Sequence, residues 1–118
     1  MVQFDCMATG GSEHSIYEAL ALVAERTPGA AAIAAPGRPQ LTYGGLYAQI
    51  ERTVGALRAA GLKREDRVAL VLPNGPELAV AFLAIASGAT CAPLNPAYGT
   101  REFHFYLSDL GARALLLP

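Results

Sequence analysis

Apolar residues recur at helical spacing in two segments of the first half of the chain. Within residues 14–26 they fall at positions i, i+4 and i+7, on one face of a helix; these residues are Ile16, Leu20 and Val23. The same spacing predicts a second helix over residues 43–60, with Thr42 as its N-cap and Gly61 at its end. Its predicted buried face consists of Leu46, Ile50, Val54 and Leu57.

The stretch between these helices predicts a small hairpin. Residues 30–35 are small and apolar, 36–39 have turn chemistry (Pro-Gly-Arg-Pro), and 40–42 form the returning strand. Residues 1–13 show no periodicity and are expected to be irregular. We therefore place the folded part of the chain at residues 14–118.

The second half alternates apolar strands with helices. Residues 68–72 are apolar on both faces, as in a buried parallel strand, and 90–94 and 114–117 predict two further strands. One helix is predicted over 78–87 and another around the stripe of Phe103, Leu107 and Leu110, with N-caps at Asn74 or Gly75 and at Gly99 or Thr100. The pattern predicts an α/β fold: an incomplete parallel βαβαβ sheet with helices, preceded by a helix and a small hairpin.

Composition indicates that this sheet is part of something larger. Hydrophobic residues make up 53 % of the chain and charged residues only 16 %, against about 25 % charged in typical soluble domains. No helix follows the last predicted strand, although a parallel sheet needs cover on both faces. We expect a truncated segment that packs against the remainder of its own domain.

Charge and cysteine content exclude several classes of protein. The net charge is −1 and the nine Lys and Arg residues are scattered, so no nucleic-acid partner is expected. Cys6 and Cys91 are far apart in sequence, which argues against a disulfide framework or a zinc site and favours a reducing, cytoplasmic compartment. Neither a membrane span nor a signal peptide is expected.

The sequence shows no catalytic constellation. The turns after the first two parallel strands contain Pro73, Pro76 and Pro96, which lack the N–H groups of a phosphate cradle, and no nucleotide-binding glycine motif is present. His104 is interpreted as a surface or half-buried residue. Glu102, Asn74 and Glu77 are interpreted as helix-capping residues. Glu65 and Asp66 are interpreted as solvated. No catalytic residue and no metal site are predicted.

Five short motifs follow one another from the hairpin to the last helix. They are LTYGGL at 41–46, DRVAL at 66–70, LPNGPE at 72–77, GATCAPLNP at 88–96 and EFHFYLSD at 102–109. In order and spacing they resemble the start of the large N-terminal, AMP-binding domain of the adenylate-forming (ANL) superfamily. The Asn-Pro pair at 95–96 is similar to the end of this motif in the acyl- and aryl-CoA synthetase branch. Residues 92–98 with 103–107 look closest to the matching segments of oxalate–CoA and long-chain acyl-CoA ligases. Gly45 replaces the family's glutamate, which implies a helix start weaker by about 1 kcal/mol.

The resemblance implies an enzyme that uses ATP and Mg²⁺ to convert a small carboxylic acid into an acyl-adenylate, and then transfers the acyl group to CoA. The family's phosphate loop, ATP-ribose motif and C-terminal catalytic lysine are not found in this sequence. The segment alone is therefore expected to be inactive, and its role to be mostly structural.

In CoA-forming relatives, the stretch after the second core motif borders the CoA channel. The resemblance implies that role for Asn95, Pro96, Ala97 and Tyr98. Some relatives carry a basic residue where this chain has Ala97, and Arg101, one helical turn on, is a candidate to replace it. The alternative is that Asn95 and Pro96 only shape a turn and that Arg101 is a solvated helix residue.

Two other functions fit the same residues. One is an adenylation enzyme that loads a carrier protein, of the fatty-acyl-AMP ligase or peptide-synthetase type. The other is a shortened, non-catalytic α/β module that binds a ligand or partner.

Overall fold

A computed structural model describes residues 15–118 of the chain. The irregular segment expected at 1–13 and the domain start at residue 14 lie outside the described residues. The elements are α1 (Ile16–Arg26), β1 (Ala31–Ile33), β2 (Leu41–Thr42), α2 (Tyr43–Ala59), β3 (Arg67–Leu70), α3 (Pro76–Gly88), β4 (Thr90–Pro93), α4 (Thr100–Leu110) and β5 (Ala114–Leu116). Among them, no helix is both long and apolar enough to cross a bilayer.

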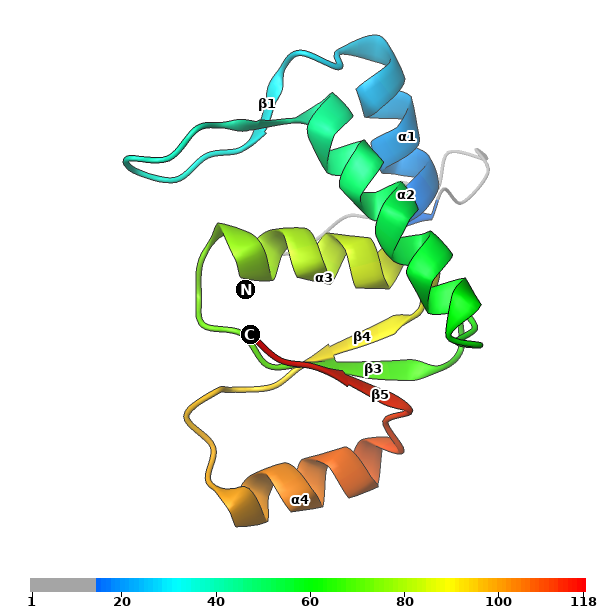
Figure 1. Cartoon of the computed structure of the whole chain (residues 1–118), viewed down its shortest axis with the longest axis vertical. Coiled ribbons are helices and arrows are strands. Elements are labelled where there is room, and N and C mark those ends of the chain that lie inside the picture. The colour runs from blue at the N-terminus through cyan, green and yellow to red at the C-terminus, as the bar shows by residue number, and fades with distance from the viewer. Residues whose placement is uncertain (1–14) are drawn as a thin grey trace, which may run out of the picture.

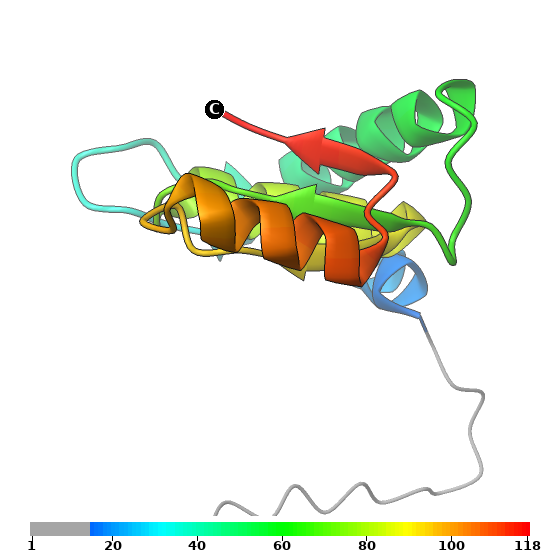
Figure 2. The ribbon, with the colours of Figure 1, turned by 90° about the horizontal axis from the view of Figure 1, so that it is seen from below.

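The three parallel strands form a sheet in the order β4-β3-β5, and β1 pairs with β2 in a separate antiparallel hairpin. Helix α3 lies against one face of the sheet with α1 and α2 beyond it, and α4 lies on the opposite face (Figure 1). The view from below shows α4 overlying β3, while β5 lies to one side (Figure 2). The predicted α/β fold with a parallel βαβαβ sheet, a preceding helix and a hairpin is confirmed.

Side-chain caps begin the first two helices. Ser15 Oγ accepts from the backbone N–H of Glu18 at 3.2 Å, and Glu18 Oε2 accepts from the Ser15 N–H at 3.0 Å, which completes a capping box. Thr42 is the N-cap of α2, as predicted, because its Oγ1 accepts from the Gly45 N–H at 3.1 Å. A Cβ at Gly45 would lie 3.0 Å from Leu41 Cδ1, so glycine allows Leu41 to pack closely here.

Helix α3 has Gly75 as its N-cap, which is one of the two caps that the sequence predicted. This residue has φ 157°, a conformation that glycine adopts at little cost, and Pro76 occupies the first turn of the helix. Asn74, the other predicted cap, is not the N-cap. Glu77 lies in the first turn of the helix, as a capping carboxylate does, and it also forms an ion pair with Arg38 of the hairpin. The pKa of Glu77 is lowered, chiefly by its hydrogen bond with Arg38.

The core consists of two apolar clusters on the same side of the sheet. Leu46 and Ile50 of α2 pack with Ala84 of α3, joined by partly buried side chains of α1 and the hairpin. The second cluster lies between α3 and the sheet and contains Leu62, Val68, Leu70, Ile85 and Ala89. Leu62 and Ala89 fall just outside the predicted helices and strands, whereas the other core residues lie within them. Because α3 contributes to both clusters, it is buried along much of its length, as its apolar sequence predicted.

Asp66 is not the solvated carboxylate that the sequence indicated. Its side chain is only 13 % exposed; Oδ2 accepts from the Lys63 N–H at 2.7 Å and Oδ1 lies 3.2 Å from Arg113 Nη1. The hydrogen bond from the Lys63 N–H, together with the Arg113 guanidinium, holds the pKa of Asp66 below its usual value. The adjacent strand β3 also differs from its prediction, since its paired residues are Arg67–Leu70 rather than 68–72. Glu65 is exposed, as predicted.

Candidate functional site

The loops that follow β3 and β4 lie at one edge of the sheet, where the carboxyl ends of the parallel strands meet. Figure 1 shows both loops and the chain terminus after β5 on the same side of the molecule. In open α/β sheets this edge is where ligands bind. The predicted CoA-channel residues belong to the loop after β4 and to the first turn of α4.

The loop after β4 closes on itself. Asn95 Oδ1 accepts from the Ala97 N–H at 2.9 Å, and the Asn95 carbonyl accepts from the Tyr98 N–H at 3.1 Å. Pro96 lies between them and fits the second position of such a turn. The backbone donors of Ala97 and Tyr98 are thus engaged within the loop, and Asn95 and Pro96 do shape a turn.

Aromatic contacts attach this loop to α4. The rings of Tyr98 and Tyr106 stack with centroids 5.0 Å apart, and Phe103 meets Tyr98 edge-on at 5.8 Å. Electrostatic interaction with Tyr106, followed by burial, raises the pKa of the Tyr98 hydroxyl. Tyr98 therefore remains a neutral anchor at physiological pH.

The start of α4 is stabilised by a carboxylate, as the sequence predicted. Glu102 Oε2 accepts from the N–H of Gly99, the N-cap, at 2.7 Å, and the Phe103 N–H donates to the Gly99 carbonyl at 3.0 Å. His104, two residues further on, is exposed, in agreement with its interpretation as a surface residue.

Arg101 is exposed in the first turn of α4. It borders a shallow depression of about 630 Å³ formed by Gly99, Thr100, Arg101, Glu102, Phe105 and Tyr106. Within the part of the chain that the structure describes, Arg101 forms no ion pair. Of the five predicted residues, Arg101 is the one that offers a cationic group to an anionic ligand; the turn and Tyr98 position it.

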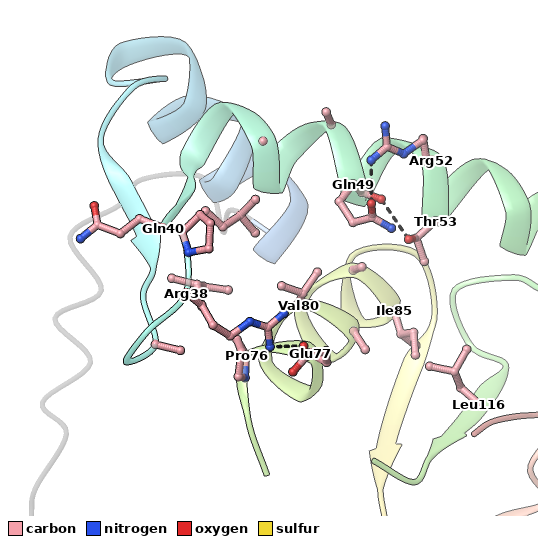
Figure 3. A pocket seen from close by; sticks show the side chains of 18 residues that line it. Arg38, Gln40, Gln49, Arg52, Thr53, Pro76, Glu77, Val80, Ile85 and Leu116 are labelled. Atoms are coloured by element: carbon pink, nitrogen blue, oxygen red, sulfur yellow. Dashed lines mark hydrogen bonds and ion pairs between the residues drawn. The ribbon is translucent and has the colours of Figure 1, made fainter. Parts of the chain in front are cut away.

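A larger groove, which the sequence did not indicate, lies on the face of the sheet opposite α4. It has a volume of about 870 Å³ and runs between the hairpin, α2, α3 and β5. Val80, Ile85 and Leu116 are among the residues that line it, and the Arg38–Glu77 pair lies at the end away from Leu116 (Figure 3). Arg52 donates to Gln49 Oε1 at 2.6 Å on the α2 wall. Its walls carry no nucleophile with an adjacent base, so the groove has the chemistry of a packing surface.

Neither a metal-ligand cluster nor a phosphate cradle is found among the described residues. Residues 15–118 contain no cluster of three His, Cys, Asp or Glu side chains that could hold an ion. The turns after β3 and β4 contain Pro73, Pro76 and Pro96 and form no glycine-rich cradle for the phosphates of ATP.

Residues 20–118 match the family described as AMP-binding enzyme. The chain is 45 % identical over 96 residues to an oxalate–CoA ligase from Arabidopsis thaliana, a match that covers 80 % of this chain and 19 % of that protein. It thus spans about a fifth of the length of this curated relative.

Two solved structures share the fold. A fatty acyl CoA synthetase from Mycobacterium tuberculosis superposes with a TM-score of 0.77 at 32 % identity, over 86 % of this chain and 20 % of that chain. The N-terminal subdomain of NpsA from Klebsiella oxytoca gives a TM-score of 0.77 at 28 % identity, over 88 % of this chain and 27 % of that chain. NpsA has also been solved as an artificially fused adenylation–PCP di-domain. With its motifs, its parallel sheet and the match over residues 20–118, this chain belongs to the AMP-binding enzyme family.

Proposed function

We propose that this chain forms the start of the AMP-binding domain of an AMP-forming acyl-CoA synthetase. The whole enzyme would activate a carboxylic acid with ATP to an acyl-adenylate and pass the acyl group to the thiol of CoA. The observation that carries this proposal is the family match over residues 20–118, combined with 45 % identity to a CoA ligase. Oxalate and fatty acids are the first substrates to consider, given the names of the relatives.

This chain's contribution would be to build one side of the domain and to guide CoA. The closed turn at 95–98 and the Tyr98–Tyr106 stack hold the first turn of α4 in place. Arg101 projects from that turn, where its guanidinium can contact a phosphate of the CoA nucleotide. The other four candidates, Asn95, Pro96, Ala97 and Tyr98, would act as shape and support for the channel.

The groups that hold ATP and Mg²⁺ are proposed to come from the rest of the enzyme. When bound, Mg²⁺ would offset phosphate charge during adenylation. No residue among 15–118 is assigned to it.

We also propose a reducing compartment, the cytoplasm. Its support is the cysteine usage: Cys6 and Cys91 are far apart in sequence, and Cys91 is a free thiol. This proposal would place the enzyme with cellular ATP and CoA.

A second candidate is an adenylation enzyme that hands its product to a carrier protein. The likeness to NpsA supports it, since NpsA has been fused to a PCP domain. The acceptor distinguishes the two functions: a CoA ligase releases acyl-CoA in solution, whereas a carrier-loading enzyme acylates a phosphopantetheinyl protein and is indifferent to free CoA.

The test is a chimera in which residues 20–118 of this chain replace the matching segment of the Arabidopsis oxalate–CoA ligase. We expect oxalate-dependent ATP–pyrophosphate exchange and oxalyl-CoA formation to persist, because the segment supplies scaffold and channel but no ATP ligands. The unmodified ligase is the control. A chimera that folds with the ligase's own thermal stability yet forms no adenylate would contradict the proposal; one that adenylates but no longer uses CoA would favour the carrier-loading function.

A further inference from the structure

Phe105 is an aromatic residue on the polar face of helix α4. It is 64 % exposed, more than any other large hydrophobic residue in the part of the chain that the structure describes. Apolar neighbours on the same helix, such as Leu107 and Leu110, are half-buried. The other exposed residues of the helix are all polar or charged: Thr100, Arg101, Glu102, His104, Ser108 and Asp109. Packing within the described residues therefore does not account for a phenylalanine at this position.

The Phe105 ring is held in place although it is exposed. It meets the Tyr106 ring edge-on, with the two centroids 5.3 Å apart, and Tyr106 stacks in turn on Tyr98 of the loop after β4. Edge-on aromatic contacts of this kind favour particular ring orientations. The chain thus presents a pre-positioned aromatic ring to the solvent.

Phe105 and Arg101 line the same depression at the start of α4. They are four residues apart on the helix, so they lie on one side of it with Cβ atoms about 5–6 Å apart. Arg101 forms no ion pair with any described residue. An aromatic ring one helical turn from a guanidinium suits a nucleotide, in which a single ribose joins a flat base to a phosphate.

One carboxylate also lines the depression and bears on where a phosphate can bind. Glu102 Oε2 accepts from the Gly99 N–H at 2.7 Å, and the positive end of the helix dipole partly offsets its charge. Glu102 is about 100° around the helix from Arg101, whereas Phe105 lies almost directly above Arg101. A phosphate therefore binds on the side of Arg101, with the base over Phe105.

We propose that Phe105 stacks on the adenine of CoA while Arg101 contacts a phosphate of the same nucleotide. This inference rests on the proposed function and names the part of CoA that the surface of α4 recognises. A carrier protein presents phosphopantetheine without adenosine, so it offers nothing to this ring. Phe105 would therefore favour free CoA over a carrier protein as the acyl acceptor.

The first measurement compares two acceptors in the chimeric ligase, CoA and phosphopantetheine, which lacks adenosine. Phe105→Ala should raise the KM for CoA at least about fivefold, as expected for loss of one base–aromatic stack, and should not change the KM for phosphopantetheine. Phe105→Tyr keeps the ring and should restore the wild-type KM. His104→Ala, at the exposed neighbour, is the control and should behave as wild type.

The second measurement uses the full chain and is independent of enzyme activity. The chain contains no tryptophan, so Phe105→Trp places a single indole at the site. CoA should quench its fluorescence, phosphopantetheine should not, and adding Arg101→Ala should raise the CoA concentration needed. Leu22→Trp, at an exposed residue of α1 on the other side of the sheet, is the control and should not be quenched (Figure 1). Circular dichroism checks that each variant keeps the fold.

The outcomes separate adenine binding from a structural role. An unchanged KM for CoA in Phe105→Ala, or an equal rise for both acceptors, overturns the proposal, and so does quenching by both compounds or by neither. A rise in the KM for ATP during pyrophosphate exchange assigns the ring to ATP and also overturns it. Quenching by CoA alone, with a chimera that forms no oxalyl-CoA, supports the adenine site and contradicts the proposed function.

Discussion

Asp66 and Arg113, which are 47 residues apart in sequence, meet where β3 and β5 begin. Arg113 Nη1 lies 3.2 Å from Asp66 Oδ1, and Asp66 Oδ2 accepts from the Lys63 N–H at 2.7 Å. The backbone joins the same two strands, since the Arg113 N–H donates to the Arg67 carbonyl at 2.9 Å. Asp66 thus ties the turn before β3 to the entry of β5.

The first prediction concerns Asp66→Asn. Because the folded state lowers the pKa of Asp66, its stabilisation is present above the unfolded pKa of about 3.9 and is lost as pH falls through the folded pKa. The variant should unfold at lower temperature than wild type at pH 7, and the two melting temperatures should converge at acid pH. Thermal melts at a series of pH values measure this. Glu65→Gln, at the exposed neighbour, is the control and should melt as wild type does. A difference in melting temperature between Asp66→Asn and wild type that does not change with pH would refute the linkage.

The second prediction concerns high pH and the contact between α1 and α2. The Tyr17 hydroxyl donates to Glu51 and lies 3.0 Å from the Tyr47 hydroxyl, and Glu51 foremost raises the pKa of Tyr17. The raised pKa means that this stabilisation is present below the unfolded pKa of about 10 and is lost as pH rises through the folded pKa. The urea midpoint of wild type should fall more steeply above pH 10 than that of Tyr17→Phe. In Tyr43→Phe, the control, the urea midpoint should fall with pH as it does in wild type. The same pH dependence in all three proteins would count against a stabilising role for the Tyr17 hydroxyl.

The third prediction tests the close approach of α2 and α3. A Cβ at Gly88 would lie 3.1 Å from Val54 Cγ2 and 3.3 Å from Leu57 Cδ1. Gly88→Val should therefore destabilise the protein by about 1–3 kcal/mol through overpacking. Gly55 is also helical but has no atom within 4 Å of its Cβ position, so Gly55→Ala should stabilise by about 0.5–1 kcal/mol. Urea denaturation gives both values, and similar effects at the two sites would show that the packing is looser than described.

The fourth prediction concerns CoA. In the chimeric ligase, Arg101→Ala should raise the KM for CoA about tenfold, as expected for loss of one charge-assisted contact. Adenylation should not change, because the proposal assigns Arg101 to the CoA channel and not to ATP binding. Arg26→Ala, an exposed arginine at the end of α1, is the matched control, and Arg101→Lys should restore part of the affinity. Unchanged CoA kinetics would remove Arg101 from the channel.

Local rules accounted for most elements. Thr42 and Gly99 act as N-caps, and Gly111 ends α4 in the left-handed conformation that glycine adopts readily. Such caps can be predicted because they interact only with residues a few positions away in sequence. The apolar runs predicted the strands. The sequence pattern misplaced Asp66 and did not reveal the ion pair of Glu77, because their partners Arg113 and Arg38 lie 47 and 39 residues away. The groove escaped notice for the same reason: Ile33, Val80 and Leu116 come together only after the chain folds.

The most direct test of the central claim is carboxylate-dependent ATP–pyrophosphate exchange by the protein purified from its source, together with its intact mass. The account predicts exchange with at least one acid in a panel that includes oxalate and fatty acids, from a polypeptide heavier than 12.3 kDa or from a complex with a second chain. A monodisperse, cooperatively folded protein of 12.3 kDa that has no partner and no exchange activity would contradict it, and would favour a free-standing binding module instead.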